Sequence, residues 1–496
     1  MSWGIANRLL TILLPFVSRT IIIQSLGAGY VGLGSLFTSL LSVLSLAELG
    51  ISESIIFSMY KPMAEGDDEA VCALLNFYRK AYRCIGGIIL AIGLLLMIRI
   101  DVFISGEYPS EMNLRVLFLI YLVNAVASYF SYSYLSVLLT ASQRNDIEYK
   151  IRCVVSIVKD TLQIVILLLF KDYYVYILIL PITTLMHNLI RAMRIKKMYP
   201  TYVCRGKVSE ATKMSIKKQV GGLLLGKLTV ASRNSFDSII LSSVIGLTAV
   251  AIYSNYYYVM NMVYGFLIYF GASIRGGIGN NVVTKSVEQN YNDMLNISEL
   301  FWWLYNICTV MLFCLYQPFM RLWAGEELMY GFWLVVLFAA YFYFLCNFVV
   351  FSQYMEAKGL YWENRKRYIF EVVSNLALNI ILVKVLGLYG IVLSTVISVF
   401  FLTNIYGVII GFKHYFKGCD SKKYLVRQVF NFIITAISCI ASYYVCSMIT
   451  VNGLFGLCLR ALTAMCVSVL IFLVCKCKTQ SLKTSKDYLF YRLKSK

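Results

Sequence analysis

The sequence predicts an all-α, polytopic membrane protein with about 14 transmembrane helices, and three compositional observations support this class. Apolar residues make up 59% of the 496-residue chain, charged residues make up only 14%, and the mean hydropathy is +0.72. Soluble chains of this length usually contain about 25% charged and 45–50% apolar residues. The composition therefore excludes ordinary soluble domains, disordered chains, collagen and secreted disulfide scaffolds.

Fourteen apolar runs, each bounded by charged residues or by Gly and Pro, are long enough to cross a hydrocarbon core of about 30 Å as helices. They lie near residues 4–25, 33–58, 81–104, 113–139, 151–170, 173–195, 217–245, 249–279, 296–320, 331–356, 367–386, 389–412, 427–449 and 455–475. We expect no soluble domain between them, because connections of at most about 20–30 residues are too short for a packed core.

The connections between these runs alternate sharply in Lys and Arg content. One side, with the C-terminal tail, carries 33 of the 45 basic residues, and the other side carries only Arg99, Arg115, Lys171, Arg321 and Lys384. The positive-inside rule then places both termini in the cytoplasm and favours an even number of spans. The formal net charge of +20 thus reflects topology and attraction to anionic membrane lipids, and we expect no nucleic-acid partner.

A weak internal repeat divides the chain. Residues 26–35 join the first two spans and resemble residues 245–254, which join the seventh and eighth; residues 171–175 similarly match 387–391. Both copies start in the cytoplasm, so the repeat is parallel, related by an axis along the membrane normal. The predicted parts are an N-lobe at 1–200 (helices 1–6), a C-lobe at 201–414 (helices 7–12), a C-terminal helix pair at 415–475 and a basic cytoplasmic tail at 476–496.

Five basic residues inside the predicted spans are candidates for binding an anionic headgroup in a cavity. Each would cost about 2.5–3.5 kcal/mol at a helix centre, so it must snorkel, pair or face water. Arg8 and Arg19 share one face of the first span, since eleven residues correspond to three turns plus about 20°. Lys227 follows Arg8 by 219 residues, which places both at equivalent depth. Arg233 and Arg275 complete the set, and structural ion pairing is the alternative interpretation.

The seventh span also carries polar residues that accompany these cations. On an ideal helix Lys227, Asn234 and Ser238 lie within about 40° of one another, so Asn234 joins the predicted cavity. Arg233 and Asp237 are four residues apart beside this stripe, and we expect them to pair.

Two further acids, Glu48 and Glu53 in the second span, are candidates for ion coupling. The alternative is that each pairs with an arginine or meets interfacial water near a helix end. Asp237 belongs to the same group of acids, with a role either in coupling or in pairing.

No motif indicates an enzyme, a metal site or a cofactor. The fourteen cysteines are mostly scattered through apolar runs, and Cys475 and Cys477 are too close together for the usual zinc spacing. The sequence contains no Walker motif and no nucleophile elbow, so an ATP-driven pump would need its ATPase on another chain.

Two segments carry a resemblance to a known family. The first is the glycine-rich turn Gly27–Gly34 after a charged first span; the second is the polar seventh span 233–241, followed by Ile245-Gly246 and by residues 251–254. Together with the fourteen spans, these resemble bacterial polysaccharide flippases, which move O-antigen or capsule repeat units, of the multidrug/oligosaccharidyl-lipid/polysaccharide exporter (MOP) superfamily. The motifs are loose, although the resemblance covers the whole chain.

The resemblance implies a V-shaped, two-lobed exporter in the bacterial plasma membrane that works by alternating access. Its substrate would be an undecaprenyl-pyrophosphate-linked oligosaccharide, moved from the inner to the outer leaflet, with polysaccharide polymerase or ligase machinery as a possible partner. The role of engaging the pyrophosphate would fall to Arg8, Arg19, Lys227 and Arg233.

Three alternatives stay open. A lipid II-type flippase shares the same logic. A multidrug/cation antiporter of the same fold should carry unpaired acids in its cavity, whereas the stripe found here is mainly basic. A membrane glycan polymerase usually needs a large external loop or a catalytic acid–base cluster, and the external loops here are short.

Overall fold

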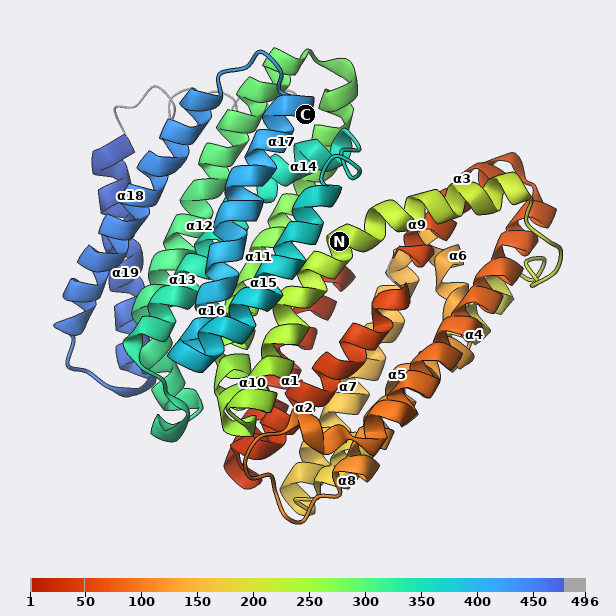
Figure 1. Cartoon of the computed structure of the whole chain (residues 1–496), viewed down its shortest axis with the longest axis horizontal. Helices are drawn as coiled ribbons and strands as arrows, with labels where there is room; N and C mark the ends of the chain where they lie inside the picture. Colours follow the sequence, from red (N-terminus) through yellow and green to blue (C-terminus); the bar gives the residue numbers. More distant parts are fainter. Residues whose placement is uncertain (1, 49, 477–496) are drawn as a thin grey trace. The chain divides into compact units, whose positions relative to one another are not determined.

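The chain folds into helices throughout the part that the structure describes. This computed structural model describes residues 2–48 and 50–476, except for the side chains of residues 2–13, 47, 222–223 and 231–232. Within those ranges every regular element is an α-, 3-10 or π-helix (Figure 1). The all-α class predicted from composition is confirmed. The predicted basic tail, apart from Lys476, lies outside the described residues.

The helices divide into two compact units, Met1–Ala251 (unit 1) and Ile252–Lys496 (unit 2). Unit 1 contains α1 (Ser2–Ser25), α2 (Ala28–Leu44), η1 (Ser45–Glu48), α3 (Ile51–Glu65), α4 (Asp68–Ile98), η2 (Ile100–Phe103), α5 (Leu114–Phe130), η3 (Ser133–Leu135), α6 (Ser136–Ala141), α7 (Asn145–Leu169), α8 (Tyr173–Met198), α9 (Glu210–Ala231), η4 (Ser232–Phe236) and α10 (Asp237–Val244). Helix α11 (Leu247–Thr284) starts at the end of unit 1. Unit 2 continues with α12 (Val287–Trp323), η5 (Glu326–Leu328), α13 (Phe332–Asn347), α14 (Val349–Ala357), α15 (Arg365–Leu386), α16 (Leu388–Ser398), η6 (Val399–Tyr406), α17 (Gly407–His414), α18 (Ser421–Ser447) and α19 (Gly453–Lys476).

Each of the fourteen predicted spans coincides with one helix or with a run of consecutive helices. Among the described residues, nine helices are long and apolar enough to cross a membrane, or ten if the pair α5 and α6, bent by 49°, is one span. The chain is therefore a multi-pass membrane protein, and the count of 14 stays a prediction. The remaining segments either carry charges, as α9 does, or are interrupted, as α2 and α3 are.

Several helices extend beyond the spans predicted for them. Helix α4, predicted as the span 81–104, begins at Asp68. The side chain of Asp67 accepts a hydrogen bond from the Ala70 amide at 2.9 Å and so caps the helix there. Helix α12 begins at Val287 after a capping box formed by Ser286 and Gln289. With 37 residues α12 is about 56 Å long, longer than the roughly 30 Å hydrocarbon core, so part of it projects from the membrane.

Unit 1 is packed around α2, whose side chains form the centre of its apolar core. Leu33, Leu36 and Phe37 are fully buried, and the ring of Phe37 meets that of Phe118 edge to face at 5.4 Å. Helix α9 packs on α3, while η4 and α10 pack on α2. Residues 201–251 were assigned to the C-lobe by the sequence repeat, but they pack with unit 1. The two divisions differ because the repeat follows the order of the helices along the chain, whereas the units follow the contacts between them.

The turns matched by the sequence repeat share a positive φ angle. Gly27, before α2, has φ 104°, and Gly246, before α11, has φ 122°. Lys171, before α8, and Gly387, before α16, also have positive φ values of 50° and 57°. Left-handed φ values favour glycine, so three of these four positions carry the residue that the turn prefers.

A polar contact is repeated at corresponding positions in the two units. In unit 1, Asn188 of α8 donates a hydrogen bond to Ser131, next to α5, at 2.8 Å. In unit 2, Asn347 of α13 donates to Asn404 of η6 at 2.9 Å. Both residues of the second pair follow those of the first by 216 residues, which supports the repeat inferred from the sequence.

The C-terminal helices α18 and α19 lie side by side and pack on α12 (Figure 1). A buried ionic cluster fixes this contact. Glu299 of α12 is fully buried, and it accepts from Lys476 of α19 at 2.7 Å and lies 3.6 Å from Arg427 of α18. Lys476 also donates to Asn431 at 2.7 Å. This cluster gives the predicted helix pair a defined attachment within unit 2.

Candidate functional site

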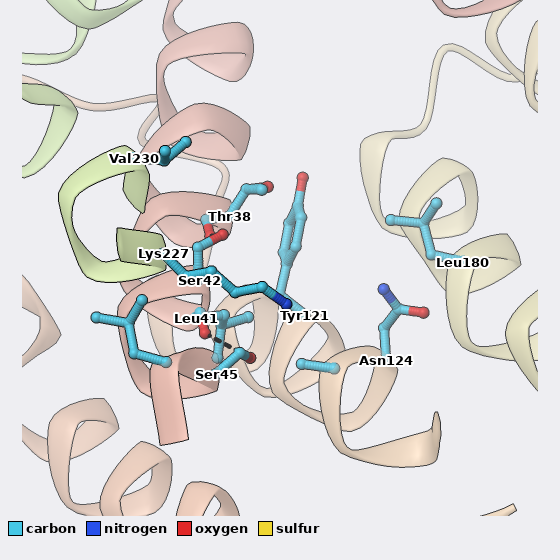
Figure 2. A pocket seen from close by; sticks show the side chains of 11 residues that line it. Thr38, Leu41, Ser42, Ser45, Tyr121, Asn124, Leu180, Lys227 and Val230 are labelled. Atoms are coloured by element: carbon cyan, nitrogen blue, oxygen red, sulfur yellow. Dashed lines mark hydrogen bonds between the residues drawn. The ribbon is translucent and has the colours of Figure 1, made fainter. Parts of the chain in front are cut away.

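Unit 1 contains a cavity of about 620 Å³ that includes one of the predicted site residues. Its walls come from α2, η1, α5, α8 and α9, and its lining residues are Thr38, Leu41, Ser42, Ser45, Leu46, Tyr121, Asn124, Ala125, Leu180, Lys227 and Val230 (Figure 2). Among these residues only Lys227 is charged. Cavities of about 300–1,000 Å³ are typical of small-molecule sites.

Lys227 projects from α9 into this cavity (Figure 2), and its ammonium group forms an ion pair with the carboxylate of Glu53 on α3. The two residues are 174 positions apart in the sequence, so the pair depends on the packing of α9 against α3. The side chains keep 36% and 50% of their surface exposed. The pair is therefore partly exposed, unlike a buried structural salt bridge, and Lys227 is its member that lines the cavity.

The rest of the cavity wall combines apolar side chains with four hydroxyl groups and one amide. Asn124 of α5 accepts a hydrogen bond from Thr184 at 2.8 Å, which fixes the orientation of its amide. The hydroxyl of Tyr121 lies 3.3 Å from that of Tyr173. Ser45 donates to the carbonyl of Leu41 at 2.9 Å. Such groups can exchange hydrogen bonds with sugar hydroxyls or phosphate oxygens.

Glu48, at the end of η1, is held by tyrosines. Its two carboxylate oxygens accept hydrogen bonds from the hydroxyls of Tyr82 and Tyr129, the latter at 2.6 Å. The rings of these tyrosines pack together at 5.1 Å between centroids. The structure therefore places Glu48 in an aromatic hydrogen-bonding cluster between α4 and α5, and Glu53 beside Lys227.

The other predicted residues of the seventh span lie in or next to a π-helical turn, η4. Arg233 donates through Nε to the carbonyl of Thr229 at 3.3 Å, Asn234 is half-buried, and Asp237 is fully buried at the start of α10. A π-turn inserts one extra residue into the helical repeat and often marks a functional site. The positions after Ser232 are therefore rotated relative to the ideal α-helix from which the stripe was predicted.

Three predicted residues lie on other helices. The side chain of Arg8 is outside the described residues. Arg19 is half-buried on α1, in the neighbourhood of Tyr173 and Tyr176 of α8. Arg275 belongs to α11 in unit 2, is 61% exposed, and lies 3.9 Å from Glu356 of α14.

Sequence reasoning identified Lys227 and Glu53 separately but not as a pair, because no local pattern links α3 to α9. It also missed Thr38, Ser42 and Asn124, since a single hydroxyl or amide in an apolar run is common and carries no signal of its own. The spacing of Ser42 four residues after Thr38, on one face of α2, is the only pattern that could have indicated them.

Comparison with known proteins identifies the fold. No family model and no curated protein matches the sequence. Among solved structures, the lipid II flippase MurJ, in an inward closed conformation, matches with a TM-score of 0.66 at 14% identity, covering 95% of this chain and 98% of that chain. An inward-facing multidrug resistance MATE family transporter of the MOP superfamily matches with a TM-score of 0.59 at 14% identity, covering 80% and 94%.

A third structure concerns pocket charge directly. It is a MOP superfamily transporter from Pyrococcus furiosus, described as having a reverse polarity of its binding pocket that suggests a different function. It matches with a TM-score of 0.52 at 13% identity, covering 82% of this chain and 93% of that chain. At such identities the likeness establishes architecture alone: the chain has the fold of the MOP-superfamily transporters and flippases.

Proposed function

We propose that this chain is a flippase for polyprenyl-pyrophosphate-linked oligosaccharides of the undecaprenyl class. It moves them from the inner to the outer leaflet of a bacterial plasma membrane by alternating access, for the synthesis of O-antigen, capsule or another surface polysaccharide. The observation that carries the proposal is the ammonium group of Lys227 in a cavity whose largely apolar wall also carries four hydroxyl groups and one amide.

The chemistry of the cavity matches such a headgroup. A pyrophosphate diester carries about two negative charges, and a lysine ammonium offers three donors to its oxygens, with an attraction that strengthens where water is displaced. The neighbouring Thr38, Ser42 and Asn124 can bind the first sugars. The polyprenyl tail need not enter, because it can stay in the surrounding lipid.

Two neighbouring functions differ in their ligand. MurJ is described as a lipid II flippase, and lipid II presents the same kind of headgroup, so the cavity suits either glycan. A multidrug/cation antiporter, the alternative with the same fold as the multidrug resistance MATE structures, needs a cavity that attracts positive charge. Here the only charged group among the described lining residues is the Lys227 ammonium, and the acid next to it, Glu53, is already paired with it, so we favour an anionic substrate that competes for this ammonium.

A proteoliposome assay tests the proposal. Undecaprenyl-pyrophosphoryl-N-acetylglucosamine is placed in the inner leaflet of the liposomes. A galactosyltransferase added outside labels the N-acetylglucosamine headgroups that reach the outer leaflet. Wild-type protein should transfer it, and Lys227→Met should not. Glu65→Gln is the matched control, since Glu65 lies on α3 in an exposed pair with Lys61. Ethidium transport without glycan transfer would instead establish a cation antiporter.

A further inference from the structure

Three acids were candidates for ion coupling, and the structure separates them. Glu48 is held by two tyrosine hydroxyls, and Asp237 is fully buried at the start of α10. Glu53 alone among the three keeps half of its side chain exposed, and its partner is the lysine that lines the cavity. Glu53 therefore sits where a change at the substrate site alters its own electrostatic surroundings.

We propose that Glu53 is a proton-binding site whose occupancy is coupled to anion binding at Lys227. The inference rests on the proposed function, because it assumes that an anion reaches this lysine. In the empty site the ammonium holds the ionised carboxylate of Glu53. An anionic headgroup competes for the same ammonium, and the displaced carboxylate takes up a proton.

The local charges favour this exchange. When the headgroup binds, two anionic groups share one ammonium, and like charges at short range favour protonation of the weaker acid. Among the contacts that the structure describes for Glu53, Lys227 is the only cation. Helix α4 presents Tyr78, whose neutral hydroxyl lies near both Glu53 and a second carboxylate, Glu48 of η1. Helix α6, which also packs on α3, contains no ionisable residue.

The proton balance follows from the exchange. Water in the cavity supplies one proton to the Glu53 carboxylate when the anion binds. When the anion leaves on the other side of the membrane, Lys227 recaptures the carboxylate, and the proton returns to water there. The empty site, with one ammonium and one carboxylate, is thus neutral. The loaded site contains the ammonium, the protonated Glu53 and a headgroup of about two negative charges, so it carries a net charge of about −1. A membrane potential that is negative inside therefore assists the loaded outward step.

Titration calorimetry on purified protein tests the coupling. The probe is farnesyl-pyrophosphoryl-N-acetylglucosamine, a short-chain pyrophosphate diester, injected in buffers of different ionisation enthalpy between pH 5.5 and 8. The wild type should take up as much as one proton per bound probe. By linkage, its affinity should fall with rising pH, by at most about tenfold per unit. Glu53→Gln should bind at least as tightly at pH 8, with no proton uptake, while Glu65→Gln should behave as the wild type.

The outcomes separate this inference from the proposed function. Probe binding by the wild type without proton uptake, at an affinity that Glu53→Gln leaves unchanged, would overturn the inference and leave the flippase proposal standing. Equal or absent binding in the wild type and in Lys227→Met would contradict the proposed function itself. Proton counting on the wild type needs no variant, so the test holds even if Glu53→Gln folds poorly.

Discussion

Replacing Lys227 with methionine should remove transport while leaving the fold almost intact. The pair with Glu53 is 36% and 50% exposed, and ion pairs of this exposure typically contribute only about 0.2–1 kcal/mol to stability. For a unit of about 250 residues, a loss of 1 kcal/mol corresponds to a fall in melting temperature of roughly 2–4 °C. Methionine keeps the length of the side chain and its packing on α9.

The effect on substrate binding should be much larger. A hydrogen bond to a charged group contributes about 1.5–3 kcal/mol, so its removal should weaken headgroup binding about 10- to 150-fold. Thermal unfolding and glycan transfer are measured on the same preparation. A Lys227→Met protein that transfers glycan at the wild-type rate would refute the assignment, as would a loss of transfer explained by unfolding alone.

Substitutions at three other places in the chain give distinct outcomes. Glu371→Gln should destabilise the protein by about 3–5 kcal/mol, because it leaves Arg367, only 6% exposed and 3.3 Å away, without its counter-ion; unchanged thermal unfolding would contradict this. Gly32→Ala should cost about 1–3 kcal/mol, since the added Cβ would stand 2.3 Å from the first backbone carbonyl of α11; melting at the wild-type temperature would refute the close approach. Neutralising Asp237 or Arg233 alone should lower protein abundance, and the double variant should recover abundance but not transport; a double variant as scarce as either single one would exclude their pairing.

The helical architecture could be predicted from the sequence because the bilayer imposes a strong local rule. Apolar runs of about 20 residues must form helices, and glycines such as Gly27 and Gly246 mark turns with positive φ. Helix ends were less predictable. The extensions of α4 and α12 follow from caps at Asp67 and Ser286, short signals that a search for apolar runs does not detect.

The candidate site was predictable only in part. The cost of an intramembrane charge was enough to select Lys227 and Glu53, but their pairing depends on tertiary packing between α3 and α9. The π-turn at Ser232–Phe236 was also missed, since the angular argument assumed an uninterrupted α-helix. Polar lining residues such as Asn124 acquire meaning only from the cavity that surrounds them.

A structure of the protein bound to farnesyl-pyrophosphoryl-N-acetylglucosamine, determined by electron cryomicroscopy, tests the central claim most directly. Our account predicts a phosphate oxygen within hydrogen-bonding distance of the Lys227 ammonium, with the Glu53 carboxylate released from it. A pyrophosphate bound elsewhere, with the pair between Lys227 and Glu53 intact, would contradict the account.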